Sequence, residues 1–184
     1  MDISLHYMEK GSGTPLILLH GNGESSLYFR NQTDAFSACF HVFAIDTRGH
    51  GMSPRGAAPF TLEQFAEDLH DFMGTHEIHN AAILGFSDGA NIAILFTLKY
   101  PEMVSMLILN GANLFPEGLR GDVLRRIDFS YRIARFFSHV SRKYLIESEL
   151  FSLMVREPHI APERLQDIHC PVLVIVGSDD MIRP

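Results

Sequence analysis

The residues best suited to chemistry in this sequence are the pentapeptide at 85–89, Gly-Phe-Ser-Asp-Gly, which holds a serine between two glycines. An apolar stretch at 81–84 precedes it and another at 91–98 follows, so the serine falls where a strand turns sharply into a helix. Such a turn exposes the hydroxyl and leaves no room for side chains at the two glycine positions. The pattern predicts Ser87 as the nucleophile of an acyl transfer.

A glycine-rich turn at 20–23, His-Gly-Asn-Gly, follows the apolar residues 15–19 and is the second chemical candidate. Backbone N–H groups in such a turn can face a cavity and stabilise the oxyanion that develops when a serine attacks a carbonyl. A phosphate-binding loop is the rival interpretation, but the spacing of a Walker or dinucleotide motif is absent. We therefore expect an oxyanion loop.

The composition limits the partners of this chemistry. The chain has 184 residues, 46% of them hydrophobic, and a net charge of −7, which argues against nucleic acid as a partner. No apolar run approaches the roughly 20 residues of a membrane span, and the first residues do not resemble a signal peptide. The two cysteines are expected to be free thiols in the cytoplasm, and no Cys/His spacing suggests zinc, so we expect no metal and no cofactor.

The elements that must position these residues alternate along the chain. From about residue 25 onward, strand-like segments alternate with helical ones, which predicts an α/β fold with a mostly parallel sheet and helices on both faces. The short link at 10–14 predicts that the first two strands form an antiparallel hairpin at one edge. Thr61 begins a capping box, and the helix it opens should run to about Thr75. The expected strands lie near 3–9, 15–20, 41–46, 80–85, 105–110 and 171–176.

The alternation stops between residues 115 and 167, where two or three helices and no strand are expected. We interpret 115–167 as a helical lid inserted before the last visible strand, and 1–114 with 168–184 as the core. The arginines of this segment are interleaved with acidic residues, which favours a solvated amphipathic surface over an anion-binding site. Its aromatic residues are interpreted as packing rather than as the lining of an acyl pocket.

Four segments follow one another along the chain, at 20–23, 46–53, 85–89 and 171–180. Together they resemble the α/β-hydrolase superfamily, specifically its small lidded esterases, lactonases and carbon–carbon hydrolases. The resemblance implies Ser87 as nucleophile, the backbone N–H groups of Asn22 and Asp88 as the oxyanion hole, and Asp180 as the catalytic acid. It implies cleavage of a carboxylic ester or related small acyl substrate through an acyl-enzyme. It also implies that His50 and Arg48 belong to a chiefly structural motif, which links their loop to the sheet, and that His20 shapes the oxyanion loop.

The strand-to-helix turn at 85–89, called the elbow below, is also similar to that of valacyclovirase-like hydrolases, which share the Gly-x-Ser-Asp-Gly pattern. In those enzymes the acidic residue favours esters that carry an α-amino group. The simpler alternative is that Asp88 contributes only its backbone N–H.

The general base is the part that this sequence does not supply. The family's catalytic histidine lies on a loop beyond the acid, and no histidine follows Asp180. His139, His159 and His169 lie in or beside the lid and are expected to be solvated or packed. Loss of the histidine of a serine triad costs about a million-fold in turnover, so the chain alone should be nearly inert.

We therefore expect a C-terminally incomplete, truncated hydrolase, or one whose catalytic histidine comes from a second chain or a missing C-terminal segment. Its last visible strand would then present an unpaired edge. A non-catalytic, ligand-binding scaffold of the same fold is the alternative, since fold alone does not establish chemistry.

Overall fold

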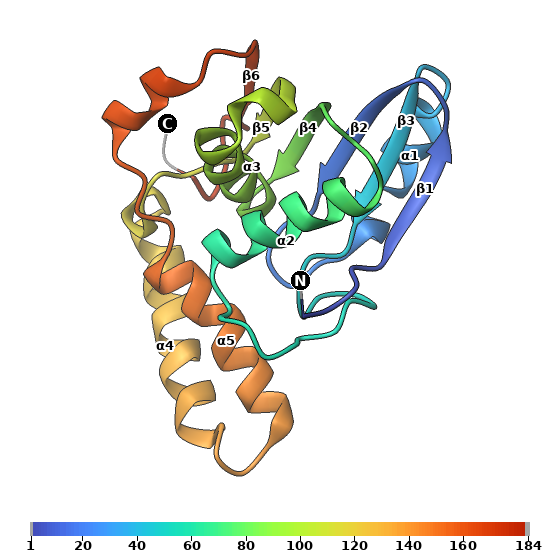
Figure 1. The fold of residues 1–184 in the computed structure, drawn as a ribbon. Coiled ribbons are helices and arrows are strands. Elements are labelled where there is room, and N and C mark those ends of the chain that lie inside the picture. The colour runs from blue at the N-terminus through green and yellow to red at the C-terminus, as the bar shows by residue number, and fades with distance from the viewer. Residues whose placement is uncertain (1, 183–184) are drawn as a thin grey trace.

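A six-stranded sheet forms the centre of the computed structural model, which describes residues 2–182. The strand order is β1-β3-β2-β4-β5-β6, and every pairing except β1 with β3 is parallel. Helix α1 lies on one face and helices α2 and α3 lie on the other (Figure 1). The expected α/β fold with a mostly parallel sheet is thereby confirmed.

The elements have the following bounds. The strands are β1 (Tyr7–Gly11), β2 (Thr14–Leu19), β3 (Phe40–Ile45), β4 (Ala81–Phe86), β5 (Val104–Asn110) and β6 (Val172–Ile175). The helices are α1 (Arg30–Phe36), α2 (Leu62–Thr75), α3 (Asp88–Lys99), α4 (Gly121–Phe137) and α5 (Arg142–Arg156). Short 3-10 helices occupy Ser26–Phe29, Pro101–Met103, Pro116–Gly118 and Pro162–Asp167.

Alternate side chains of the central strands fill two separate hydrophobic cores, because successive residues of a strand point to opposite faces of the sheet. Each such buried side chain contributes about 1.5–3 kcal/mol by leaving water. Ile17, Leu19, Phe43 and Ile45 pack in the core that also contains residues of α2 and α3, whereas Leu16, Leu18, Val42 and Ala44 pack on the opposite face near Phe36 of α1.

The expected hairpin between the first two strands is wrong. Strand β1 does lie antiparallel at the sheet edge, but its partner is β3, which separates β1 from β2. The link between β1 and β2 instead crosses the start of β3 at Phe40. Gly11 (φ 84°) and Gly13 (φ 106°) permit this crossing, and a Cβ on Gly11 would collide with the backbone of Ser37 and Phe40.

Helix α2 begins as its capping box predicts. The Thr61 side chain accepts a hydrogen bond from the backbone N–H of Gln64 at 3.1 Å, which satisfies one of the free amides of the first turn. The buried residues of this helix recur at helical spacing and face the core; they include Leu62, Phe65, Leu69 and Phe72. The helix ends at Thr75 as expected.

Helices α4 and α5 form a pair that projects from the sheet domain (Figure 1). Strand and helix stop alternating here, and two helices flanked by short 3-10 helices occupy the segment, as expected. Phe129 and Phe136 of α4 are 66% and 76% exposed, so the outer helix presents apolar side chains to solvent. The interpretation of 115–167 as a lid stays a prediction.

Strand β6 is the edge of the described sheet and pairs only with β5 within residues 2–182. Residues Val172–Val176 are all apolar and between 45% and 65% exposed, so neither face of this strand is covered. The expectation of an unpaired edge at the last visible strand is therefore confirmed. Among the described helices, none is both long and apolar enough to cross a membrane. Both cysteines are free, as expected.

Candidate active site

Ser87 occupies the sharp turn between β4 and α3, with φ 53° and ψ −121°. A positive φ is strained for a residue that carries a Cβ and costs about 1–3 kcal/mol. The Ser87 N–H donates to the carbonyl of Asn110 at the end of β5 at 2.8 Å. The Ser87 carbonyl accepts from Ala90 and Asn91 in the first turn of α3. The turn is thus held from both sides, and its strained conformation is compatible with the role predicted for Ser87.

The two glycines of the elbow are required by close backbone contacts. A Cβ on Gly85 would collide with the backbone of Gly89 and Ala90. A Cβ on Gly89 would collide with the carbonyl of Leu19 at the end of β2. These contacts bring the start of α3 against β2, which places the loop after β2 beside Ser87.

Two backbone N–H groups beside Ser87, one from the loop at 20–23 and one from the start of α3, are candidates for an oxyanion hole. A Cβ built on Gly21 would lie 3.2 Å from the Ser87 Cβ, so this loop and the elbow are in direct contact. The Asn22 N–H makes no hydrogen bond to any described residue, and the Asp88 N–H is among the free amides of the first turn of α3. This geometry is compatible with the role that the sequence predicts for both residues.

The side chain of Asp88 is buried beneath this site. Its carboxylate accepts hydrogen bonds from the amide of Asn22 at 2.9 Å and from the amide of Asn91 at 3.4 Å. Burial raises the pKa of Asp88, and the two amides only partly offset this effect. The carboxylate therefore bonds to neighbouring amides, which supports the simpler interpretation of Asp88.

Asp180 follows β6 in a turn at the same end of the sheet as Ser87. Its two carboxylate oxygens accept hydrogen bonds from the N–H groups of Gly177 at 3.4 Å and Ile182 at 3.2 Å. Asp179 is 95% exposed at its side chain and pairs with Arg120 at 3.1 Å, so it is turned away. No hydrogen bond joins Asp180 to Ser87 in the described part of the chain.

His20 and His50 are buried in a network of their own. His20 Nε2 accepts from the Thr47 N–H at 3.1 Å, and its Nδ1 donates to the Gly21 carbonyl at 2.7 Å. His50 Nδ1 donates to the Arg48 carbonyl at 3.0 Å. Burial lowers the pKa of His20 and lowers that of His50 to about 4, with a further decrease from His20. Both rings are neutral, and their hydrogen bonds support the loops that follow β2 and β3.

No imidazole bonds to Ser87 among residues 2–182. The three histidines around the helix pair are exposed on the surface: His139, His159 and His169. The sequence predicts that these three are either solvated or packed, and the structure shows that they are solvated.

Arg48 holds the loop after β3 on the core. Its fully buried guanidinium donates two hydrogen bonds to Asp68 of α2, at 2.6 and 2.7 Å, and one to Asp2 at 2.6 Å. These carboxylates raise the pKa of Arg48 against the opposing effect of burial. Buried ion pairs of this kind fix geometry, and losing one partner is costly. The contacts fit the structural role that the resemblance implies for this motif.

Two carboxylates near the site are not evident from the sequence. Glu24 accepts from the Gly21 N–H at 3.1 Å, and burial raises its pKa. Glu157 accepts from the Leu62 N–H at 2.7 Å, and burial, with smaller effects from Glu63 and Asp88, raises its pKa to about 7. An acidic residue directly after the His-Gly-Asn-Gly turn is the only sequence signal for Glu24, and none points to Glu157.

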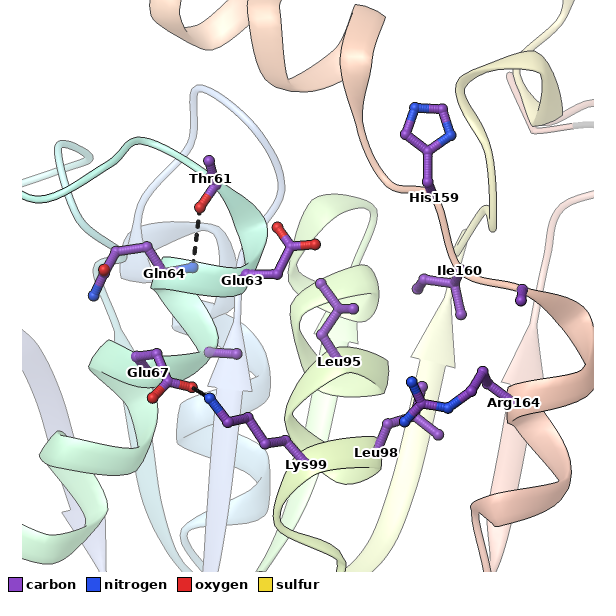
Figure 2. A pocket seen from close by; sticks show the side chains of 12 residues that line it. Thr61, Glu63, Gln64, Glu67, Leu95, Leu98, Lys99, His159, Ile160 and Arg164 are labelled. Atoms are coloured by element: carbon purple, nitrogen blue, oxygen red, sulfur yellow. Dashed lines mark hydrogen bonds and ion pairs between the residues drawn. The ribbon is translucent and has the colours of Figure 1, made fainter.

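A groove of about 670 Å³ lies elsewhere, between α2, α3 and the segment after α5 (Figure 2). Figure 2 shows Leu95, Leu98 and Ile160 along its floor and the ion pair between Glu67 and Lys99 at one side. Its lining includes neither Ser87 nor the loop at 20–23. The groove is therefore distinct from the region around Ser87.

Comparison with known proteins identifies the family. A family model described as the alpha/beta hydrolase fold matches residues 14–144. The chain belongs to the α/β-hydrolase fold family. The matched residues include the elbow, the loop at 20–23 and the loop that carries Arg48. The resemblance stated from the sequence is thereby confirmed.

Two relatives whose matches extend over nearly all of this chain are named as hydrolases. The (E)-2-((N-methylformamido)methylene)succinate hydrolase of Acinetobacter baylyi is 28% identical over 200 residues, which covers 95% of this chain and 76% of the relative. The 2-hydroxy-6-oxononadienedioate/2-hydroxy-6-oxononatrienedioate hydrolase of Paraburkholderia phymatum is 27% identical. That match covers 100% of this chain and 77% of the relative. These matches support hydrolase activity in this family member.

A solved structure of the meta-cleavage product hydrolase CumD from Pseudomonas fluorescens IP01 superposes with a TM-score of 0.74. It is 26% identical, and the match covers 99% of this chain and 79% of that one. The chain thus spans about three-quarters to four-fifths of the length of these proteins.

Proposed function

We propose that this protein is a serine hydrolase that cleaves a carboxylic ester or a related small acyl substrate through an acyl-enzyme. One observation carries the proposal: Ser87 is held at φ 53° in a strained turn, and the two neighbouring backbone N–H groups, at Asn22 and Asp88, have no acceptor among residues 2–182. A chain keeps such strain and such free donors where they serve binding or chemistry.

In the proposed reaction the Ser87 Oγ adds to the carbonyl carbon of the substrate while its proton passes to a base. The carbonyl oxygen becomes an oxyanion that accepts hydrogen bonds from the N–H groups of Asn22 and Asp88. The positive end of the α3 dipole adds to this stabilisation. Collapse expels the alcohol with a proton and leaves an acyl-Ser87 ester, which water then hydrolyses to the acid and free Ser87.

The base of this reaction is proposed to be an imidazole from outside the described residues, because none of these bonds to Ser87. A further segment or a second chain would bring it to the end of the sheet where Asp180 can orient it. The open edge of β6 supports this, since an added strand could pair there beside Asp180.

Turnover of p-nitrophenyl acetate by the 184-residue protein tests the proposal, with free imidazole as a substitute base and Ser87→Ala as control. We expect turnover near the uncatalysed rate without imidazole, because a missing triad histidine costs about a million-fold. After the rate with imidazole alone is subtracted, because imidazole itself cleaves this ester, imidazole should raise the turnover of the wild type but not that of Ser87→Ala. Ordinary turnover without imidazole would remove the missing-base proposal, and equal turnover in Ser87→Ala would remove Ser87 as nucleophile.

A non-catalytic ligand-binding scaffold is the second candidate, and it is favoured by the finding that no imidazole of the described residues bonds to Ser87. The two functions differ in whether the serine can be activated. A fluorophosphonate that fails to label Ser87 even with imidazole present would favour the scaffold.

We propose that Asp88 acts through its N–H rather than by binding a substrate amine. The hydrogen bonds from Asn22 and Asn91 to its buried carboxylate support this choice. An aminoacyl p-nitrophenyl ester and its des-amino analogue should then react at similar rates in the imidazole-supplemented assay. A clear preference for the amine would restore Asp88 as a specificity residue.

A further inference from the structure

The side chain of Asn22 joins three parts of the molecule. Its amide nitrogen donates to Asp88 Oδ2 at 2.9 Å and to the carbonyl oxygen of Leu150 at 3.0 Å. Asp88 is the first residue of α3, and Leu150 lies within α5, 128 positions further along the chain than Asn22. The loop after β2 is therefore bonded both to the nucleophile helix and to the projecting helix pair.

Helix α5 is fixed to the core at the same turn by an independent contact. Glu149, next to Leu150, accepts a two-pronged ion pair from Arg55, with Nη2 at 2.7 Å and Nε at 3.0 Å. At the end of α5, Glu157 accepts from the Leu62 N–H. The position of α5 over the loop is thus set by groups that do not touch Ser87.

We propose that Asn22 is a positioning residue whose side chain couples the docking of α5 to the separation of the two backbone N–H groups of the oxyanion hole. The inference rests on the proposed function, because it assigns these N–H groups to the oxyanion. It adds a role for α5: the helix holds the Asn22 amide in the orientation that reaches Asp88.

The two ends of the Asn22–Asp88 bond differ in how firmly they are held. Asp88 is buried at the start of α3 and is also bonded by Asn91, which in turn exchanges two hydrogen bonds of 3.1 Å with Asn113. Asn22 is half-buried in a loop, and its side chain bonds only to Asp88 and Leu150 within the described structure. When α5 shifts, the loop is therefore the part that moves.

Movement of the loop has a direct chemical consequence. An oxyanion gains most from donors fixed in advance at about 2.7–3.1 Å, and a misplacement near 1 Å costs about 100-fold in rate. If α5 leaves, the Asn22 amide loses its acceptor at Leu150 and can rotate away from Asp88. The distance between the N–H groups of Asn22 and Asp88 is then no longer fixed.

Amide hydrogen exchange at Gly21 and Glu24, whose N–H groups are hydrogen-bonded within the loop, tests the coupling without any need for turnover. Glu149→Gln weakens the ion pair to Arg55, whereas Glu147→Gln is the matched control because Glu147 pairs only with Lys143 on α5 itself, at 3.7 Å. We expect Glu149→Gln to speed exchange at the loop by about fivefold or more, the size expected for loss of one hydrogen bond. Glu147→Gln should leave exchange unchanged.

The coupling must also depend on the Asn22 side chain. In an Asn22→Ala background, Glu149→Gln should add no further increase in exchange. Equal effects of Glu149→Gln in both backgrounds, or equal effects of the two glutamate variants, would overturn the proposal. If Asn22→Ala does not fold, the comparison of Glu149→Gln with Glu147→Gln still decides it.

Phenylboronic acid measures the consequence for the oxyanion hole, because it forms a tetrahedral adduct with a serine Oγ that ¹¹B NMR detects. Asn22→Ala should weaken adduct formation about tenfold and Glu149→Gln by a smaller factor, with no change for Glu147→Gln. Unchanged affinity in Asn22→Ala would overturn the positioning role. Unchanged binding in Ser87→Ala would instead refute the proposed nucleophile while leaving the exchange result intact.

Discussion

Replacing Ser87 with glycine should stabilise the protein, because the turn holds this residue at φ 53°. Glycine adopts positive φ without steric cost, whereas any residue with a Cβ is strained there. In Ser87→Ala the Cβ is retained, and so is the strain. The pair of variants therefore separates backbone strain from loss of the hydroxyl.

The expected gain follows from two opposing effects. Relief of the strained backbone contributes about 1–3 kcal/mol, and the greater freedom of glycine in the unfolded chain removes about 0.4–1 kcal/mol. The net gain is about 1 kcal/mol, which raises the Tm of a domain of this size by about 2–4 °C. The structure shows no hydrogen bond of the Ser87 hydroxyl to another described residue, so no side-chain contact offsets this gain.

Thermal unfolding followed by circular dichroism is the assay, supported by the midpoint of reversible guanidinium unfolding. Ser87→Gly should be more stable than both the wild type and Ser87→Ala, which should be equal to each other. A Ser87→Gly variant no more stable than Ser87→Ala would show that the turn stores no strain at this residue, and the structural reason for the elbow would fail.

Three further perturbations test other parts of the structure. Arg48→Met leaves the carboxylate of Asp68 buried without its partner and should cost about 3–5 kcal/mol in urea unfolding; a loss below 1 kcal/mol would contradict the structural role of Arg48. The pKa of Glu157 is raised to about 7 from 4.5, so the folded chain binds this proton more tightly than the unfolded chain. The contribution of Glu157 to folding stability is therefore fully present below pH 4.5 and is lost as the pH rises through 7. Glu157→Gln should reduce that fall between pH 5 and 8 in chemical denaturation, and an unchanged pH slope would refute the assignment. Val174→Lys places a charge on the 65% exposed edge strand and should lower light scattering by the concentrated protein, whereas unchanged scattering would show that β6 does not drive association.

The parts of the fold that could be predicted are those fixed by short-range patterns. The elbow needs glycines at 85 and 89 because the backbones of β2 and α3 meet there, so the requirement is visible in five consecutive residues. The capping box at Thr61 and the buried strands have equally local signals. Each of these has its signal within a few consecutive positions, although Gly89 is also required by the distant carbonyl of Leu19.

The partner of β1 could not be found in this way. A short link at 10–14 usually joins neighbouring antiparallel strands, but here β3 enters between β1 and β2. Strand pairing depends on which distant segment has the better complementary edge. Link length alone does not carry that information.

The contacts that organise the candidate site are also non-local. Nothing near Asn22 in the sequence indicates that its side chain bonds to a carbonyl of α5, because any residue of a helix presents the same backbone group. The ion pair between Arg55 and Glu149 joins positions 94 apart. The residue types of the site were therefore predictable, whereas the attachment of α5 to it was not.

Labelling of Ser87 by a fluorophosphonate in the presence of imidazole tests the central claim most directly. Intact mass and peptide mapping of the 184-residue protein should show one adduct, on Ser87, whose rate of formation rises with imidazole concentration and which is absent in Ser87→Ala. A chain that stays unlabelled with imidazole, or is labelled equally in Ser87→Ala, would contradict Ser87 as the nucleophile of this hydrolase fold.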